Sequence, residues 1–210
     1  MTTQWTEFLN PDVIRRRFAH AGLFLATSEI LQSAIQEPLH EFFSTSWSAD
    51  KGWSTSPKYR TNVLKLDPKG KNDAHRASIA WLLRHDIIDT KDAASIRKLT
   101  EERNRIAHEM RKFATGSNVL PFESYFPELV RLVTKIDKWW TINVTIPTNP
   151  DFDDRDIDES EVQPGSTILL QILEQVALAN DVEAWKLYNE FVSGMETQHP
   201  RSGSRSGSSE

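Results

Sequence analysis

Hydrophobic residues recur every three or four positions along most of the chain, the spacing that places them on one face of an α-helix. Proline, glycine and capping residues separate the segments that carry this pattern. The sequence therefore predicts an all-α fold, a helical bundle of four core helices. These helices are expected from Asn10 to Pro38, from Asn72 to Asp86, from Thr90 to Ala114 and from Pro127 to Trp139.

Other segments lack the helical spacing. Residues 44–70, rich in Ser, Thr, Lys and Trp, are expected to form a long loop insertion with one short strand at Thr61–Leu66. A second stretch of β-branched residues, Thr141–Ile146, also favours extended backbone. Together with the four helices, these segments make up a predicted core domain of residues 1–146.

The last third of the chain is expected to be organised differently. Seven acidic residues and one arginine within residues 151–161 predict a solvated acidic linker over residues 147–162. Residues 163–193 read as two amphipathic helices, a C-terminal helical pair that packs on the core. The polar stretch 194–210 is expected to be a disordered tail.

Composition narrows the class of protein. The 210 residues are 38% hydrophobic and 26% charged, which suits a globular domain with a real core. The absence of cysteine excludes disulfides, thiolate metal sites and cysteine nucleophiles. No apolar run approaches the length of a membrane span, and the start of the chain lacks the pattern of a secretion signal. We therefore expect a cytoplasmic protein that does not contact membranes.

Charge is distributed unevenly along the chain. Residues 51–112 hold 15 basic and 8 acidic side chains, a net of +7, although the whole chain carries −5. A basic block in an acidic protein is typical of an anion-binding surface, but also of ordinary solvated helix faces. The acidic linker has two interpretations as well, a simple spacer or a segment that imitates a nucleic-acid backbone.

One helix has an arginine on its apolar stripe. The helix expected at 90–114 places Leu99, Ile106 and Met110 on one face, and Arg103 fills the turn between Leu99 and Ile106. A charge on a core-facing stripe is costly unless it is paired or lies at an opening in the fold. The alternative is that the arginine stem packs while its head reaches water.

His108 follows Arg103 by five residues, which separates their directions by about 140° around a helix. Between them runs a seam of small residues, one every seventh position: Ala93, Thr100, Ala107 and Ala114. Such a seam admits a close approach of another backbone. The approaching chain could be a second copy, making the seam a dimer interface, or another helix of the same chain.

The segment Arg103-Asn104-Arg105-Ile106-Ala107-His108 resembles the signature of HEPN-domain proteins, an arginine and a histidine separated by four to six residues, often with a polar residue directly after the arginine. In a second match, Arg15 to His20, two further arginines follow the first, and Phe18-Ala19 do not extend the family pattern. The resemblance implies a helical bundle that forms a homodimer. It further implies a metal-independent ribonuclease that uses no cofactor and acts on RNA as a toxin or in defence against phages. Two kinds of protein partner are compatible with this reading, a neutralising antitoxin or another component of a defence system.

In that family reading Arg103, Asn104 and His108 are the catalytic residues. Histidine can move a proton near neutral pH, and arginine can hold a phosphate while its charge develops. Further RNA contacts are expected from basic residues on the same helix and in the loop: Arg97, Arg105, Arg111, Lys112, Lys69 and Lys71. Trp47 and Trp53 are expected to pin the loop to the core. The alternative is that they contact single-stranded RNA, because the loop mixes aromatic rings with basic side chains: Lys58, Tyr59, Arg60, Lys65, Lys69 and Lys71. No pair of histidines has metal-ligand spacing, so no metal is expected.

Two features qualify this reading. Met110 stands where some family toxins have a tyrosine that a partner nucleotidyltransferase modifies, so control by that route is not expected. The competing function is a non-catalytic all-α module, in which the same helix serves only for dimerisation or for binding a partner in a toxin–antitoxin or defence system.

Overall fold

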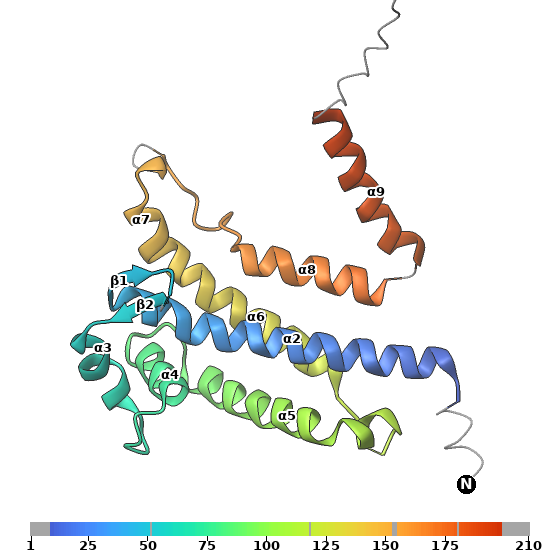
Figure 1. Ribbon diagram of the computed structural model, residues 1–210, viewed down its shortest axis with the longest axis horizontal. Helices are drawn as coiled ribbons and strands as arrows, with labels where there is room; N and C mark the ends of the chain where they lie inside the picture. Colours follow the sequence, from blue (N-terminus) through green and yellow to red (C-terminus); the bar gives the residue numbers. More distant parts are fainter. Residues whose placement is uncertain (1–8, 51, 118, 153–154, 180, 199–210) are drawn as a thin grey trace, which may run out of the picture.

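The computed structural model describes residues 9–50, 52–117, 119–152, 155–179 and 181–198 (Figure 1). Over these ranges the chain is mostly helical, so the predicted all-α class is confirmed. The four core helices are α2 (Pro11–Phe42), α4 (Ala74–Arg84), α5 (Thr90–Ala114) and α6 (Phe122–Trp140). The other elements are β1 (Ser44–Ser48), β2 (Gly52–Thr55), α3 (Pro57–Asn62), a 3-10 turn (Leu64–Leu66), a π-helical turn (Thr141–Thr145), α7 (Ile146–Thr148), a second 3-10 turn (Pro150–Phe152), α8 (Gly165–Leu178) and α9 (Asp181–Gln198).

α2 begins where the sequence predicts and runs past its predicted end. The Asn10 side chain caps it by accepting hydrogen bonds from two backbone N–H groups of the first turn. The predicted end at Pro38 is wrong, because the helix continues to Phe42 with Pro38 inside it. Proline costs one backbone hydrogen bond, but the next residue, Leu39, is fully buried. The packing of this turn outweighs the loss.

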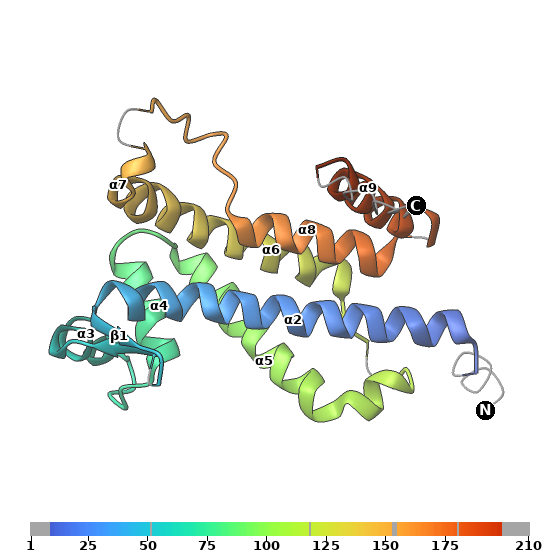
Figure 2. The same ribbon diagram turned by 45° about the horizontal axis from the view of Figure 1, so that its top comes forward.

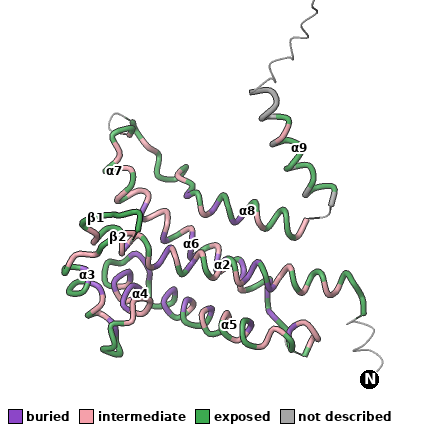
Figure 3. Tube along the Cα trace, viewed as in Figure 1, coloured by how far each residue is buried: buried purple, intermediate pink, exposed green. Residues whose placement is uncertain are grey.

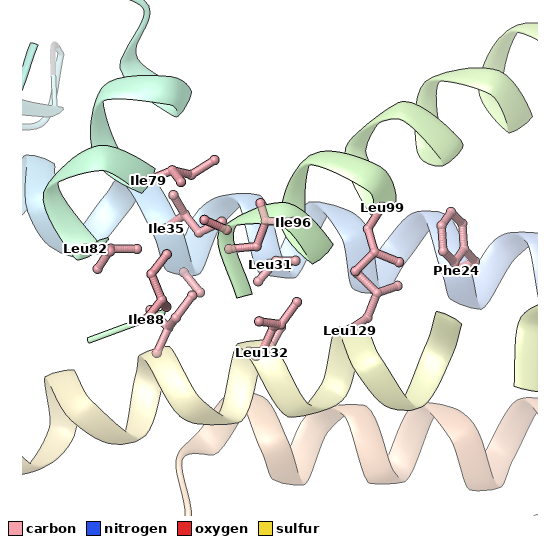
Figure 4. Packing of buried hydrophobic residues seen from close by; sticks show 14 of the residues in the cluster. Phe24, Leu31, Ile35, Ile79, Leu82, Ile88, Ile96, Leu99, Leu129 and Leu132 are labelled. Atoms are coloured by element: carbon pink, nitrogen blue, oxygen red, sulfur yellow. The ribbon is translucent and has the colours of Figure 1, made fainter. Parts of the chain in front are cut away.

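The core forms around α2, which contacts α4, α5, α6 and α8. In Figure 2, α5 lies below α2, while α6 and α8 lie above it. Burial of each large aliphatic side chain contributes about 1.5–3 kcal/mol. Figure 4 shows side chains from the four core helices meeting at the centre: Phe24, Leu31, Ile35, Ile79, Leu82, Ile96, Leu99, Leu129 and Leu132.

Both segments predicted to be extended are helical. Thr61–Leu66 is not a strand, because it falls in α3 and the following 3-10 turn, where buried Tyr59 and Val63 lie one helical turn apart. Thr141–Ile146 continues α6 as a π-helical turn leading into α7. The Thr141 hydroxyl donates to a carbonyl one turn earlier at 2.8 Å, which satisfies it within the helix. Packing and local bonding outweigh β propensity at both places.

α6 begins at Phe122, five residues before the predicted start at Pro127. Pro127 lies inside the helix, which costs one backbone hydrogen bond. Phe122 and Phe126 are both buried and stack on each other, with ring centroids 4.9 Å apart. Their packing keeps the first turn helical.

The predicted loop insertion contains an antiparallel hairpin, β1–β2, in which Trp47 pairs with Trp53 across the strands. Trp47 is 61% exposed, so the prediction that it pins the loop to the core is wrong. The side chain of Trp53 lies outside the described residues. The backbone N–H of Ser56 donates to the C=O of Phe43 at 2.9 Å and holds the hairpin at the end of α2 instead.

The C-terminal helices pack unequally. α8 rests on α2 and α6, with Leu170 buried, whereas α9 contacts α8 and points away from the core in Figures 1 and 2. The tail predicted from residue 194 starts too early, because α9 extends to Gln198, and residues 199–210 lie outside the described part of the chain. Figure 3 shows the outer faces of both helices as exposed. No helix in the described ranges is long and apolar enough to cross a membrane.

Between α6 and α8 the predicted acidic linker is partly ordered. Its first residues form α7 and a 3-10 turn at Pro150–Phe152, and residues 155–164 have no helix or strand. The Lys138 amine donates to the backbone C=O of Ser160 at 3.4 Å, which attaches the linker to the end of α6. Residues 153 and 154 lie outside the described part of the chain.

A buried carboxylate ties the start of α5 to α6. Asp92 is 3% exposed and accepts a hydrogen bond from the backbone N–H of Asp89, completing a capping box. Arg131 and Lys135 of α6 each donate to it at 2.6 Å. Burial by itself would raise the Asp92 pKa, but the hydrogen bonds from Lys135, Arg131 and Asp89 outweigh it and lower the pKa to about 2.

We expect Asp92→Asn to lower the free energy of unfolding at pH 7 by about 1.5–3 kcal/mol, the usual contribution of hydrogen bonds to a charged group. Because the folded pKa lies below the unfolded one, the difference should shrink as the pH falls from about 4 to about 2. Urea unfolding of both proteins at each pH measures this difference in the free energy of unfolding. Asp12→Asn, at an exposed ion pair on α2, is the control and should change little. An Asp92→Asn protein as stable as wild type at pH 7 would contradict this role.

Candidate functional site

The HEPN-like motif lies in the middle of α5, just before a break in that helix. Glu109 has non-helical backbone angles, φ −115° and ψ 24°, so the helix changes direction between His108 and Met110. Ile106 is buried and anchors the motif against the core. Arg103 to His108 therefore lie in one regular helical segment, and the residues after Glu109 lie in another.

Arg103 is positioned by α2. Its side chain is 36% exposed, and its Nε donates to Oε1 of Glu29 at 2.9 Å, with a second guanidinium nitrogen on the same oxygen. The remaining terminal nitrogen donates to Oδ1 of Asn104 at 3.1 Å. The positive charge of Arg103, which the sequence places on the apolar stripe of the helix, is thus paired with Glu29 and also reaches solvent. Such an exposed pair adds little stability, but it fixes the direction of the guanidinium.

His108 is exposed and makes no hydrogen bond with any other residue in the described ranges. It leaves the helix about 140° away from Arg103. Asn104 is exposed, and its Oδ1 accepts a hydrogen bond from Arg103, so Asn104 orients the arginine rather than the imidazole of His108. One chain therefore does not bring Arg103 and His108 to a common point.

The basic residues predicted to contact RNA divide into two kinds. Arg105 pairs with Glu102, which raises the pKa of Arg105, and Lys112 pairs with Glu109 at 2.6 Å. Arg97, Arg111, Lys69 and Lys71 are exposed and form no ion pair with another described residue. Lys69 and Lys71 belong to the segment that joins the 3-10 turn at Leu64–Leu66 to α4. Figure 1 shows this segment beyond the start of α5, at the end of the helix away from the motif.

The predicted seam does not form one continuous surface. Ala93 is 3% exposed and belongs to the core, so it is not part of a dimer interface in this fold. Thr100 is half-buried and its hydroxyl donates within the helix, while Ala107 is exposed. Ala114 lies beyond the break at Glu109, and its carbonyl accepts a hydrogen bond from Arg17 of α2. Only Ala107 and the edge of Thr100 remain for contact with another chain.

A half-buried histidine beside Arg103 was missed by the sequence reasoning. His75, on α4, lines a cavity of about 20 Å³, room for about one water molecule, with Arg103 and Thr100 of α5 and Ser28 of α2. Both ring nitrogens of His75 are buried and form no hydrogen bond with any of the described residues. Burial lowers the pKa of His75. The sequence signal was its spacing from Ile79 and Leu82, four and seven residues on, which marks the core face of α4.

Comparison with known proteins adds no assignment: no family model, curated protein or solved structure matches this chain. The similarity to HEPN-domain proteins thus rests on residues 103–108 alone. Among the described residues, no group of three or more His, Asp or Glu side chains is placed to hold a metal ion.

We expect wild-type stability to fall as the pH drops below about 6.5, because the unfolded chain then binds a proton at His75 before the folded chain does. His75→Leu removes this titration and fills the site with an apolar side chain. Its free energy of unfolding should therefore decrease less than that of wild type between pH 7 and pH 5.5, measured by urea unfolding. Identical pH dependence in the two proteins would show that His75 is protonated equally well when folded.

Proposed function

We propose that this protein is a metal-independent endoribonuclease that acts as a toxin or as an effector of defence against phages. The observation that carries the proposal is the exposed imidazole of His108, which forms no hydrogen bond with another described residue and lies five residues from an arginine that Glu29 and Asn104 orient at the surface. These are the two side chains that RNA cleavage without a metal requires. A cytoplasmic location, where RNA is available as a substrate, is part of this proposal.

The chemistry follows from the side chains. One imidazole takes the proton from the 2′-hydroxyl, and the 2′-oxygen attacks the adjacent phosphorus. The bond from phosphorus to the 5′-oxygen breaks, and that oxygen takes up a proton from a protonated imidazole. The products are a 2′,3′-cyclic phosphate and a free 5′-hydroxyl. The Arg103 guanidinium binds the phosphate oxygens as their charge increases.

The proposal includes a homodimer. Arg103 and His108 of one chain diverge, so a second chain is needed to bring the arginine of one copy to the histidine of the other. Ala107, exposed beside both, is the part of the predicted seam that such a contact would use. Pairing with a phosphate would also require Arg103 to exchange its contact with Glu29.

A second candidate function is a non-catalytic module that binds a protein partner. It is favoured by the exposed apolar residues of the C-terminal helices: Ile168, Leu169, Ile172, Val176, Val182, Trp185 and Tyr188. Apolar surface of this extent is typical of sites that bind other proteins. In the nuclease proposal the same face would bind a neutralising antitoxin or another component of the defence system.

We expect the purified protein to cleave single-stranded RNA in excess EDTA and to leave a cyclic phosphate, detected by mass spectrometry. His108→Ala should lower kcat/KM by about 100-fold or more, the usual contribution of a general acid or base. His85→Ala, at another exposed histidine, is the matched control and should retain activity. Cleavage that requires added magnesium, or that persists in His108→Ala, would favour the non-catalytic module.

Assembly has its own test. Ala107→Trp should give a folded monomer with little activity, because the bulky indole prevents close approach of two α5 helices. Ala94→Trp, at another exposed alanine of α5, should leave the dimer intact. Light scattering measures the mass and circular dichroism the helix content. A dimeric Ala107→Trp protein, or a wild type that is monomeric while active, would rule out this interface.

A further inference from the structure

A second group of cations lies outside α5, on the segment that connects the hairpin to α4. These five side chains are exposed and form no ion pair with any residue in the described part of the chain: Lys58, Arg60, Lys65, Lys69 and Lys71. They occur within a protein whose net charge is −5. A concentrated group of unpaired positive charges in an acidic protein produces a local positive potential.

α3 presents the first of these cations to solvent because of the way it is anchored. Tyr59 and Val63 are buried, and the Tyr59 ring packs edge-on against His40 of α2, 5.5 Å between ring centroids. Lys58 and Arg60 flank Tyr59, so helical geometry turns each about 100° away from the buried side, in opposite directions around α3. The anchor at Tyr59 thus leaves both charges exposed, one on each flank of the helix.

The turn after α3 is built around a buried carboxylate. Asp67 accepts hydrogen bonds from the backbone N–H groups of Lys69 at 3.1 Å, Lys71 at 3.0 Å and Asp73 at 3.0 Å. The Arg76 guanidinium donates to both its oxygens at 2.8 and 2.9 Å. The guanidinium, followed by the backbone N–H groups, holds the Asp67 pKa well below its usual range.

Two consequences follow from this arrangement. The backbone N–H groups point inward to Asp67, while the side chains of Lys69 and Lys71 stay exposed, with Gly70 between them in the left-handed region at φ +64°. The charge of Asp67 is already balanced by Arg76, so it does not neutralise the lysines. The hydrogen bonds to Asp67 therefore fix the backbone of the turn, while the positive charges of Lys69 and Lys71 face solvent.

An exposed aromatic ring lies on the neighbouring hairpin. Trp47 of β1 is 61% exposed, and both views of the fold show the hairpin beside α3 (Figures 1 and 2). The exposed indole presents a flat aromatic face to solvent. An unpaired base can stack on such a ring, whereas a duplex keeps its bases inside the helix.

We propose that the hairpin, α3 and the turn at residues 67–71 form a surface that binds single-stranded RNA, separate from the Arg103–His108 segment. The five cations neutralise backbone phosphates, and Trp47 stacks on an unpaired base. The inference rests on the proposed function only in taking RNA as the substrate. Binding at this surface does not require cleavage, so the two can fail separately.

The test measures binding of a fluorescent oligouridine of about 15 nucleotides, the upper range for one single-strand binding unit, with His108→Ala in every protein so that the RNA stays intact. The surface variant is Lys58→Ala/Arg60→Ala/Lys65→Ala. The matched control, Lys91→Ala/Arg155→Ala/Lys186→Ala, removes the same charge from exposed positions elsewhere. Thermal unfolding checks that the variants fold equally well.

The surface variant should reduce the slope of log Kd against log salt by about 2, since each phosphate contact on a single strand contributes about 0.7. Trp47→Ala should raise Kd about five-fold or more for the oligouridine at one salt concentration, and leave a duplex of the same length unaffected. Equal weakening by the control variant, equal loss of duplex binding in Trp47→Ala, or no binding of the single strand at low salt would overturn the proposal. Intact binding in a protein that never cleaves RNA would contradict only the nuclease.

Discussion

The structure depends on the burial of one long helix along much of its length. α2 contacts α4, α5, α6 and α8, and its residues Phe24, Ile35 and Leu39 are fully buried. Because α4, α5, α6 and α8 all pack on α2, their positions depend on it. The same helix supplies Glu29, which holds the Arg103 guanidinium. The candidate site is therefore positioned by the helix that organises the core.

The starts of α2 and α4 were predicted well, because they depend on local chemistry. Asn10 and Asp73 accept hydrogen bonds from the first turns of these helices, and both are visible in the sequence as capping residues. Two misplaced boundaries depend instead on how side chains pack in the core. Pro38 and Pro127 read as helix boundaries, yet each lies inside a helix whose neighbouring residues are buried. Tertiary packing decides whether a proline ends a helix.

In the candidate site, too, the features set by the local sequence were predicted and those set by packing were not. The motif at residues 103–108 was placed correctly on a helix, and the spacing correctly separated Arg103 from His108. The partner of Arg103 was not visible, because Glu29 is 74 residues away. His75 was not singled out by the sequence either, although it lies in a cavity with Arg103. Ala93 was assigned to an interface by its spacing, and its burial inside the chain shows that spacing alone does not distinguish inner from outer contacts.

The break at Glu109 divides α5 into two helical segments that run in different directions. The turns that carry Arg103 and His108 are continuous with the capped, ion-paired start of the helix. The last turns, with Arg111 and Lys112, follow a residue that has already left helical geometry. Phe113 is buried and the Ala114 carbonyl accepts a hydrogen bond from Arg17, so the last turns are held by the core and by α2. The end of α5 therefore takes its direction separately from the turns that carry Arg103 and His108.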